Sequence, residues 1–250
     1  MTELNKIEQC ARLIQNAKNV LVLTGAGMST ESGIPDFRSI NGLYAGKFKG
    51  LSPEIILSTD FFKEHPELFW EFISIHMNYS GAKPNIGHYI LAKWQQYKDV
   101  TILTQNIEQL HQLSGSLQVI ELHGNIKTAT CLNVDCGEKY TLEDVLSKVN
   151  GYICKCGSPI KPDVVLYGDY VDNMSSAYSM IKNADLLIVL GTSLTVYPVA
   201  EIPELFDRHM NHMIIVNRAL TRYNNTHNCI EIHGSIGKVL QAIDSLAFRI

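Results

Sequence analysis

The chain has 250 residues, a length that suits one large domain or two modest ones and that can bury a core without disulfides. Hydrophobic residues make up 46% and charged residues 18%, which excludes overall disorder, and no apolar run reaches the ~18 residues of a membrane span. The net charge of −4 argues against a general nucleic-acid binder but allows a protein partner that carries lysines.

The elements predicted along the chain alternate between helices and buried strands. Residues 5–17 have the apolar spacing of an amphipathic helix, with Cys10 on the buried stripe, and the run NVLVLT then leads into a glycine turn. Further apolar runs lie at 100–104, 119–122, 164–166, 185–190 and 213–216, and helical periods lie at 87–97, 174–183, 198–209 and 235–246. This alternation predicts an α/β fold with a parallel sheet and ligands at the carboxyl ends of its strands.

Two segments interrupt the alternation. Residues 41–83 are rich in aromatic side chains and have helical patterning, whereas residues 126–160 contain four of the six cysteines. We expect a main nucleotide-binding domain formed by 1–40, 84–125 and 161–250, with the two interrupting segments forming a smaller helical and zinc-binding module. A cleft between two such units is a common ligand site.

The four clustered cysteines have the pattern of a metal site. Cys131 and Cys136 form one pair, Cys154 and Cys156 form another, and residues 137–153 separate the pairs. Two such pairs suit a tetrahedral zinc held by four thiolates, and a closed set of four sulfur ligands predicts a structural ion. Reduced core cysteines are the alternative. The polar N-terminal stretch has no apolar signal-peptide core, so we expect a cytoplasmic protein.

The first candidate ligand motif is TGAGMSTESGIPDFRS at 24–39. Gly25 and Gly27 follow a strand, where a phosphate can approach backbone N–H groups. Asp36, Phe37 and Arg38 then bring a carboxylate, an aromatic face and a cation into one loop that could cover a ligand and exclude water. A glycine turn without a ligand is the alternative.

Two more motifs follow predicted strands. TQNIEQLH offers the side-chain amides of Gln105 and Asn106, or merely a helix cap. ELHGN places His123 at a strand end, where an imidazole with a pKa near ~6.5 suits a general base, although most histidines are structural.

The last motifs lie near the C-terminal end of the predicted sheet. GTSLTVYPVA offers the hydroxyls of Thr192 and Ser193 to a ribose or phosphate, with a simple loop cap as the alternative. Asn217 ends the next predicted strand and is a similar candidate.

Together these motifs resemble the sirtuin family of NAD-dependent protein deacylases over residues 10–245. The likeness rests on the order of GAGMSTESGIPDFRS, TQNIEQLH, ELHGN, the cysteine pairs, KPDVVLYGD, GTSLTVYP and VN. It implies a Rossmann-like domain, a small zinc and helical module, and NAD in the cleft between them.

The resemblance also implies a role for individual residues. It implies that Ala26, Gly27 and Thr30 contact the phosphates and the nicotinamide ribose. It also implies that the loop over the nicotinamide contains Asp36, Phe37 and Arg38. The residues it places beside the nicotinamide are Gln105, Asn106, Ile107 and Glu108. Those it places at the adenosine half of NAD are Thr192, Ser193, Asn217 and Ile236. An acyl-lysine peptide would pair with Val165, Leu166 and Tyr167, and zinc would bind Cys131, Cys136, Cys154 and Cys156.

The implied reaction is deacetylation of lysine with consumption of NAD, giving nicotinamide, 2′-O-acetyl-ADP-ribose and free lysine. His123 would be the general base for the ribose hydroxyls, with Asn106 as a second catalytic residue. Alternatives are ADP-ribosyl transfer to protein, removal of longer acyl groups, NAD-linked oxidoreduction, and a non-catalytic module that binds ADP-ribose or acyl-lysine.

Two departures from the family pattern carry further expectations. Glu108 stands where the family has Asp, which predicts looser binding of nicotinamide. Ile73 and His76 stand where succinyl-preferring members have Tyr and Arg, which predicts a preference for acetyl over succinyl groups. An apolar acyl channel is expected from Phe48, Phe61, Phe72 and Tyr167, with core packing as the alternative for the phenylalanines.

Overall fold

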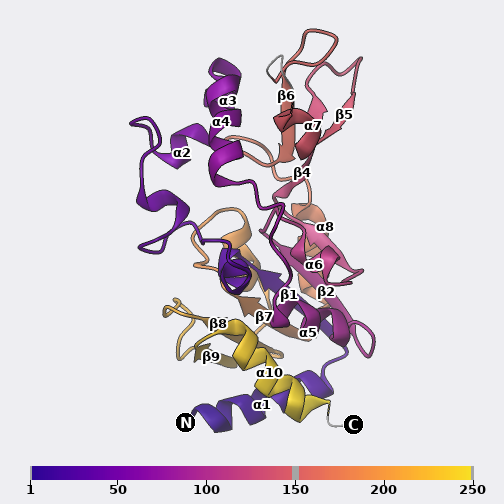
Figure 1. The fold of residues 1–250 in the computed structure, drawn as a ribbon. Coiled ribbons are helices and arrows are strands. Elements are labelled where there is room, and N and C mark those ends of the chain that lie inside the picture. Colours follow the sequence, from indigo (N-terminus) through magenta and orange to yellow (C-terminus); the bar gives the residue numbers. More distant parts are fainter. Residues whose placement is uncertain (1, 148–151, 249–250) are drawn as a thin grey trace.

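The computed structural model describes residues 2–147 and 152–248, and its centre is a six-stranded parallel sheet (Figure 1). The strands lie in the order β3-β2-β1-β7-β8-β9. Their bounds are Asn19–Thr24 (β1), Asp99–Thr104 (β2), Val119–Glu121 (β3), Leu186–Leu190 (β7), His212–Asn217 (β8) and Cys229–His233 (β9). The chain proceeds from β1 through β2 to β3 and then returns to β7 on the other side of β1. This reversal of direction opens a crevice at the carboxyl ends of β1 and β7.

Helices cover both faces of the sheet, which explains why its strands are continuous apolar runs. Along β1, Val20 and Val22 pack in one buried cluster, and Leu21 and Leu23 pack in another on the opposite face. The first cluster includes residues of α1 (Glu3–Asn16), α5 (Ile86–Trp94) and α10 (Ile236–Ala247), and the second includes residues of α8 (Met174–Asn183) and α9 (Ile202–Leu205). The alternation follows from the two-residue period of a strand.

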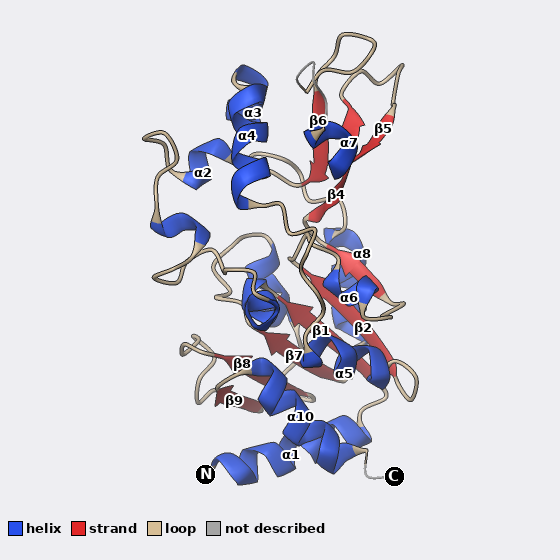
Figure 2. Cartoon of the chain, in the orientation of Figure 1, coloured by secondary structure: helices blue, strands red, loops and turns tan. Residues whose placement is uncertain are grey.

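A separate module lies beyond the sheet (Figure 2). Its second sheet is antiparallel, with the order β5-β4-β6. These strands span Gly124–Cys131 (β4), Lys139–Thr141 (β5) and Ile160–Val164 (β6), and the helices of the module are α2 (Pro53–Ile56), α3 (Thr59–Glu64), α4 (Pro66–His76) and α7 (Leu142–Leu146).

The module has its own hydrophobic core. Phe69 and Trp70 of α4 are fully buried against Ile126 and Ile160 of the antiparallel sheet. The indole N–H of Trp70 donates a hydrogen bond to the carbonyl oxygen of Ile160 at 2.9 Å, which joins the two interrupting segments of the chain. The domain boundaries given above stay a prediction. Strand β6 begins at Ile160 and therefore runs across the boundary expected between residues 160 and 161.

The structure corrects three expectations about elements. The apolar run at 164–166 is not a strand of the parallel sheet, because residues 160–164 pair with β4 in the antiparallel sheet. The helix expected over 198–209 is only a 3₁₀ turn, η3 (Val199–Glu201), followed by α9, whose chain turns extended at Phe206. Strand β9 was not expected. Within the described residues, no helix is long and apolar enough to cross a membrane.

Candidate active site

A cavity of about 710 Å³ lies at the carboxyl ends of the parallel strands. Its size is within the range of small-molecule and cofactor sites. The sequence-predicted residues that line it are Ala26, Gly27, Thr30, Asp36, Phe37, Arg38, Gln105, Asn106, Ile107, His123, Val165, Leu166, Tyr167, Thr192, Ser193, Asn217 and Ile236. The fold thus brings motifs from the whole length of the chain to one site.

Glycines allow two loops to interlock at the floor of this cavity. A Cβ on Gly27 would lie 2.7 Å from Gly191 Cα, and a Cβ on Gly25 would lie 2.7 Å from Thr192 Cβ. Gly191 has a φ of 62°, and a Cβ there would lie 2.5 Å from the backbone nitrogen of Met28. The glycines therefore serve the packing of the loops after β1 and β7, rather than only the approach of a phosphate.

Asn106 is oriented by a chain of buried hydrogen bonds. Its side-chain NH₂ donates to Ser29 Oγ at 3.0 Å, and the Ser29 hydroxyl in turn donates to Glu108 Oε1. The other oxygen of Glu108 accepts the backbone N–H of Ile107 at 3.1 Å. The bond to Ser29 fixes the orientation of the Asn106 amide, so its carbonyl oxygen and its second N–H are the groups available to a ligand.

Glu108 is not among the described residues that line the cavity, although it was expected beside the nicotinamide. Its carboxyl group is buried behind Asn106. Burial raises the pKa of Glu108, whereas the hydrogen bond from Ser29 acts in the opposite direction. Glu108 therefore acts on the site through Ser29, and its predicted direct contact with nicotinamide stays a prediction.

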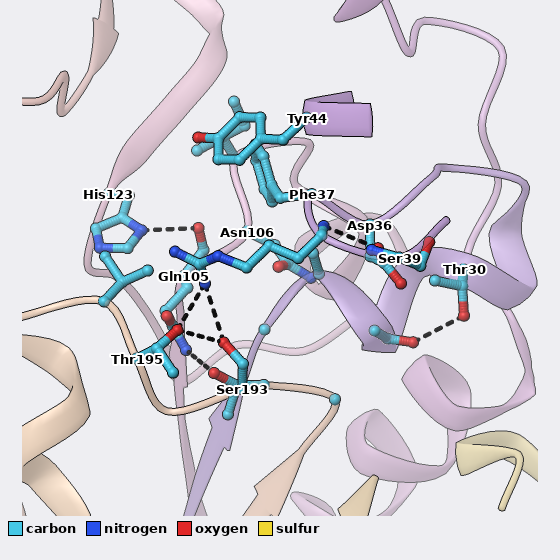
Figure 3. A pocket seen from close by; sticks show the side chains of 18 of the residues that line it. Thr30, Asp36, Phe37, Ser39, Tyr44, Gln105, Asn106, His123, Ser193 and Thr195 are labelled. Carbon is cyan, nitrogen blue, oxygen red and sulfur yellow. Dashed lines mark hydrogen bonds between the residues drawn. The ribbon is translucent and has the colours of Figure 1, made fainter. Parts of the chain in front are cut away.

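Gln105 and Thr192 join the ends of β2 and β7. Gln105 Nε2 donates to Thr192 Oγ1 at 3.0 Å (Figure 3). Asn217 at the end of β8 donates to the Thr192 carbonyl oxygen at 3.1 Å. Side-chain amides from two strand ends, those of β2 and β8, are thus fixed around the loop that follows β7.

His123 presents one ring nitrogen to the protein backbone. Its Nδ1 lies 3.1 Å from the Gln105 carbonyl oxygen, so this nitrogen carries the proton and Nε2 has the free lone pair (Figure 3). Burial lowers the pKa of His123, and the bond to Gln105 opposes that shift. The imidazole is therefore neutral near pH 7 and can accept a proton.

The loop after η1 (Ala26–Ser32) forms a lid across the cavity. Asp36 Oδ1 accepts the backbone N–H of Arg38 at 3.1 Å and that of Ser39 at 2.7 Å, which fixes the turn. The guanidinium of Arg38 then donates to Ser193 Oγ at 3.0 Å and to Thr195 Oγ1 at 2.7 Å. A cation from the lid thus lies against the opposite loop, where a diphosphate would also need positive charge.

Aromatic residues connect this lid to the segment expected to bind peptide. The Phe37 ring lies edge-on to Tyr44, with centroids 5.2 Å apart. The Tyr44 hydroxyl is 2.8 Å from that of Tyr167. Lid, aromatic pair and Tyr167 therefore form one continuous wall.

The segment expected to pair with a peptide has its own N–H groups engaged. Val165 N–H donates to the His123 carbonyl at 3.0 Å, Leu166 N–H to Asp169 Oδ2 at 3.0 Å, and Tyr167 N–H to the Leu57 carbonyl at 2.9 Å. Two of its carbonyl oxygens are engaged as well, since Asp169 N–H donates to Leu166 and Thr59 N–H to Tyr167, both at 2.9 Å. A substrate strand added here would therefore have to share acceptors with these internal bonds or use the Val165 carbonyl oxygen.

One end of the cavity is apolar. Leu57, Ile73 and Met77 line it, with Ile73 fully buried. The expectation that phenylalanines line this channel is wrong: Phe48, Phe61 and Phe72 are not among the described residues that line the cavity. They pack within the module core instead, with the rings of Phe48 and Phe72 5.5 Å apart between centroids. His76 is also outside the described lining, with its ring 4.9 Å from that of Phe72.

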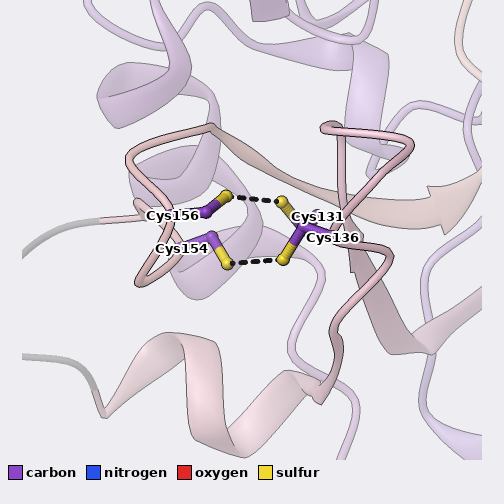
Figure 4. Close-up of side chains that lie close together, drawn as sticks. All are labelled: Cys131, Cys136, Cys154 and Cys156. Carbon is purple, nitrogen blue, oxygen red and sulfur yellow. Dashed lines mark hydrogen bonds between the residues drawn. The ribbon is translucent and has the colours of Figure 1, made fainter.

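The four clustered cysteines converge as the spacing predicts (Figure 4). Their Sγ atoms all lie within 4.8 Å of one another. The closest cross-pair separations are 3.4 Å between Cys131 and Cys156 and 3.7 Å between Cys136 and Cys154. Zn–S bonds of about 2.3 Å in a tetrahedron require sulfur atoms near this spacing, so the donor set fits one zinc ion.

Sequence reasoning missed several residues of the site. Ser29 is buried within a quoted motif, but only the fold shows that Asn106 and Glu108 meet at its hydroxyl. Thr195 and Arg218 also line the cavity. Arg218 directly follows Asn217, and a search of the residues next to each strand end would have found it.

The fold and the site define a class: a Rossmann-type α/β protein with a dinucleotide-sized cleft and a four-cysteine module. A model of the Sir2 family matches residues 25–198. An NAD-dependent protein deacetylase of Clostridium acetobutylicum is 45% identical over 249 residues, covering 97% of this chain and 100% of that protein. NAD-dependent protein deacetylase 2 of Geobacillus kaustophilus is 42% identical, covering 96% of this chain and 97% of that protein.

Solved structures agree with these relatives. A Sir2 structure with a p53 peptide and NAD⁺ has a TM-score of 0.84 at 35% identity, covering 96% of this chain and 97% of that one. A Sir2 protein bound to a propionylated peptide also has a TM-score of 0.84, at 34% identity, covering 96% and 98%. The chain belongs to the Sir2 family.

Proposed function

We propose that this protein is an NAD-dependent protein lysine deacetylase. The observation that carries the proposal is that His123, Asn106 and the apolar end at Ile73 open on the same cavity. One site can therefore hold a dinucleotide beside an uncharged acyl chain. The names of the relatives support the same activity.

The residues of the cavity fit NAD. Hydroxyls and amides of Thr30, Ser193 and Asn217 suit ribose and phosphate oxygens, and Arg38 and Arg218 supply positive charge near them. NAD supplies a ribose carbon that becomes strongly electrophilic as nicotinamide leaves, and the weakly nucleophilic acyl oxygen of the substrate captures that carbon. With one water molecule consumed, the products are nicotinamide, 2′-O-acetyl-ADP-ribose and free lysine.

The chain's own residues then orient the reactants and move a proton. His123 accepts a ribose hydroxyl proton at Nε2, while Gln105 holds the other nitrogen in the N–H form. Asn106 offers its carbonyl oxygen to the ribose, and the bond from its NH₂ group to Ser29 fixes the orientation of the amide. Phe37, braced by Tyr44, shields the site from water.

The four cysteines serve a structural zinc in this proposal. All four ligand positions are sulfur, which leaves no open position for a substrate. The separate core around Trp70 supports the predicted division into a nucleotide-binding domain and a zinc and helical module. All six cysteines are free, which supports the proposed cytoplasmic location.

The test is mass spectrometry of an acetyl-lysine peptide incubated with the protein, with and without NAD⁺. We expect loss of the acetyl group only with NAD⁺, together with equal amounts of nicotinamide and acetyl-ADP-ribose. Formation of NADH from candidate alcohols would indicate an oxidoreductase, and a protein that gains ADP-ribose would indicate a transferase. Binding of both ligands without any product would indicate a non-catalytic module.

A further inference from the structure

Two histidines that the proposed mechanism does not use lie behind the Gln105–Asn106 turn. His88 of α5 is 0% exposed and His111 of α6 (Leu110–Leu113) is 2% exposed. Their ring centroids are 4.7 Å apart, with an interplanar angle of 56°. Buried side chains of this polarity need a reason, because each unpaired polar atom is costly.

Hydrogen bonds connect His111 to the active-site turn. The Thr24 hydroxyl donates to Thr104 Oγ1 at 2.9 Å, and the backbone N–H of Asn106 donates to the same oxygen at 3.0 Å. His111 Nε2 lies 3.1 Å from Thr24 Oγ1. Because the single hydrogen of Thr24 is already given to Thr104, His111 Nε2 must carry a proton and donate it.

The second histidine has a complementary tautomer. His88 Nδ1 accepts the backbone N–H of Asn85 at 3.2 Å, so its proton lies on Nε2. His88 Nε2 is then a donor and His111 Nδ1 an acceptor, and neither has a hydrogen-bond partner among the described residues, although the two rings are in contact. The two rings therefore meet by contact, and the hydrogen bonds on either side of them form the rest of the series.

The other end of the series contacts the cofactor loop. Asn85 Nδ2 donates to the Met28 carbonyl at 2.8 Å and to Ser32 Oγ at 3.0 Å, both within η1. Hydrogen bonds thus connect His88 to the segment after β1 and His111 to the backbone of Asn106, and the contact between the two rings joins these halves.

We propose that His88 and His111 are positioning residues, which fix Asn106 relative to the cofactor loop through Thr24 and Thr104. The catalytic consequence rests on the proposed deacetylase function, whereas the structural consequence does not. Both rings must stay neutral for the series to hold. Burial lowers the pKa of His88 to about 4 and that of His111 well below its usual range, which meets this requirement.

The test compares His111→Leu with His111→Gln, because glutamine keeps an N–H donor near the position of Nε2. We expect His111→Leu to lower kcat about 10- to 100-fold with little change in KM for NAD⁺, since a small displacement of a catalytic group costs this much. Thr24→Val should lower kcat similarly, and the double variant should be no slower, because both changes break one series. His111→Gln should recover most of the rate.

Ser114→Ala is the matched control. The Ser114 hydroxyl bonds the backbone carbonyls of His88 and His111, at 3.2 Å and 2.7 Å, but not their rings. It should lower the melting temperature without lowering kcat. If His111→Leu lowers only the melting temperature, as this control does, the positioning role is wrong.

Two readouts do not depend on activity. Amide hydrogen exchange at Asn106 should be faster in Thr24→Val and His111→Leu than in wild type, and unchanged in Ser114→Ala. Nitrogen NMR of wild type should show both histidines as neutral Nε2–H tautomers near pH 7. A His111 that carries its proton on Nδ1 would overturn the proposal, and an inactive wild type with these same readouts would overturn only the deacetylase function.

Discussion

The ring of His123 and the carbonyl oxygen of Gln105 are joined by a hydrogen bond of 3.1 Å. It places the proposed general base next to the turn that holds Asn106. The tautomer of the base is therefore set by the backbone of the neighbouring strand end.

Replacement of His123 by Ala should lower kcat/KM for an acetyl-lysine peptide by about 10²–10⁴-fold, the usual contribution of a general base. Steady-state kinetics measures this loss, and calorimetry should show that NAD⁺ still binds. His209→Ala, at an exposed histidine away from the cavity, is the control and should leave the rate unchanged. Near-full turnover of His123→Ala would remove the base from the mechanism.

The value of kcat/KM should stay near its maximum as the pH falls into the acidic range. A base is active when deprotonated, so activity is lost as pH falls through its pKa. Burial lowers the pKa of His123 from the ordinary 6.5, so the acidic limb should lie below pH 6.5. An acidic limb above pH 6.5 would contradict this environment for His123.

Zinc should be present at one ion per chain and should stabilise the module without taking part in the reaction. Its removal should therefore loosen the fold of the module. Trp70 reports this change, because its indole bonds Ile160 and stacks on Tyr152 at 5.3 Å. The chain has two tryptophans, so Trp94→Phe leaves Trp70 as the fluorophore. Chelation should shift its emission to longer wavelength.

Cys154→Ser should reproduce that emission shift, whereas Cys229→Ser, outside the cluster, should not. Elemental analysis of protein purified without chelator gives the stoichiometry. Fully active protein that contains no zinc would refute the structural role.

Glu108→Gln should lower kcat about tenfold or more, because the new amide NH₂ cannot accept the Ile107 N–H while its oxygen serves Ser29. Ser29→Ala should have a comparable effect. The double variant should be no worse than either, since both changes release the Asn106 amide. Additive losses in the kinetic cycle would mean that Glu108 acts on the ligand independently of Ser29.

Acetyl-lysine, and longer neutral acyl groups, should be removed faster than succinyl-lysine from one peptide. Arg38 and Arg218 are the cations of the described lining, and they bond Ser193 and Thr30, away from the apolar end. A succinyl carboxylate would be buried there without a charged partner, which costs several kcal/mol of binding free energy. The kcat/KM for succinyl-lysine should therefore be lower than that for acetyl-lysine by at least about tenfold.

Ile73→Ala should widen this end and raise the butyryl-to-acetyl ratio of kcat/KM. Ile75→Ala, on the same helix but 61% exposed, should leave the ratio unchanged. Faster removal of succinyl than of acetyl would reveal a cation that the cavity lining does not show.

Strands buried on both faces were predictable from the sequence, because the burial itself produces continuous apolar runs. Edge strand β9 was missed because Glu231 interrupts its apolar pattern. That carboxylate is 3% exposed and accepts hydrogen bonds from the backbone and hydroxyl of Thr221, which a local pattern cannot show.

The run at 164–166 looks like the other apolar runs, and its sheet is decided by pairing with a distant strand. Its Val164 lies opposite Gly124, where a Cβ would lie 2.0 Å from the Asp163 carbonyl oxygen. Local periodicity contains no information about such a partner.

The candidate site was predicted well where residues follow strand ends, because parallel strands bring those ends to one edge. The apolar end of the cavity was not predicted correctly, because helical spacing does not say which side of a buried helix meets a cavity. On α4, Ile73 lines the cavity whereas the adjacent Phe72 packs in the core. Tyr44 and Tyr167 likewise meet only in three dimensions.

The interlock of Gly27 with Gly191 also governs which hybrids of this protein and its relatives can fold. Each glycine occupies the space that a side chain on the other would need. Residues 25–33 and 190–198 are therefore one unit of recombination, although more than 150 positions of sequence lie between them. A chimera with both segments from one parent keeps the fit, whereas a crossover between them combines two surfaces that were shaped separately.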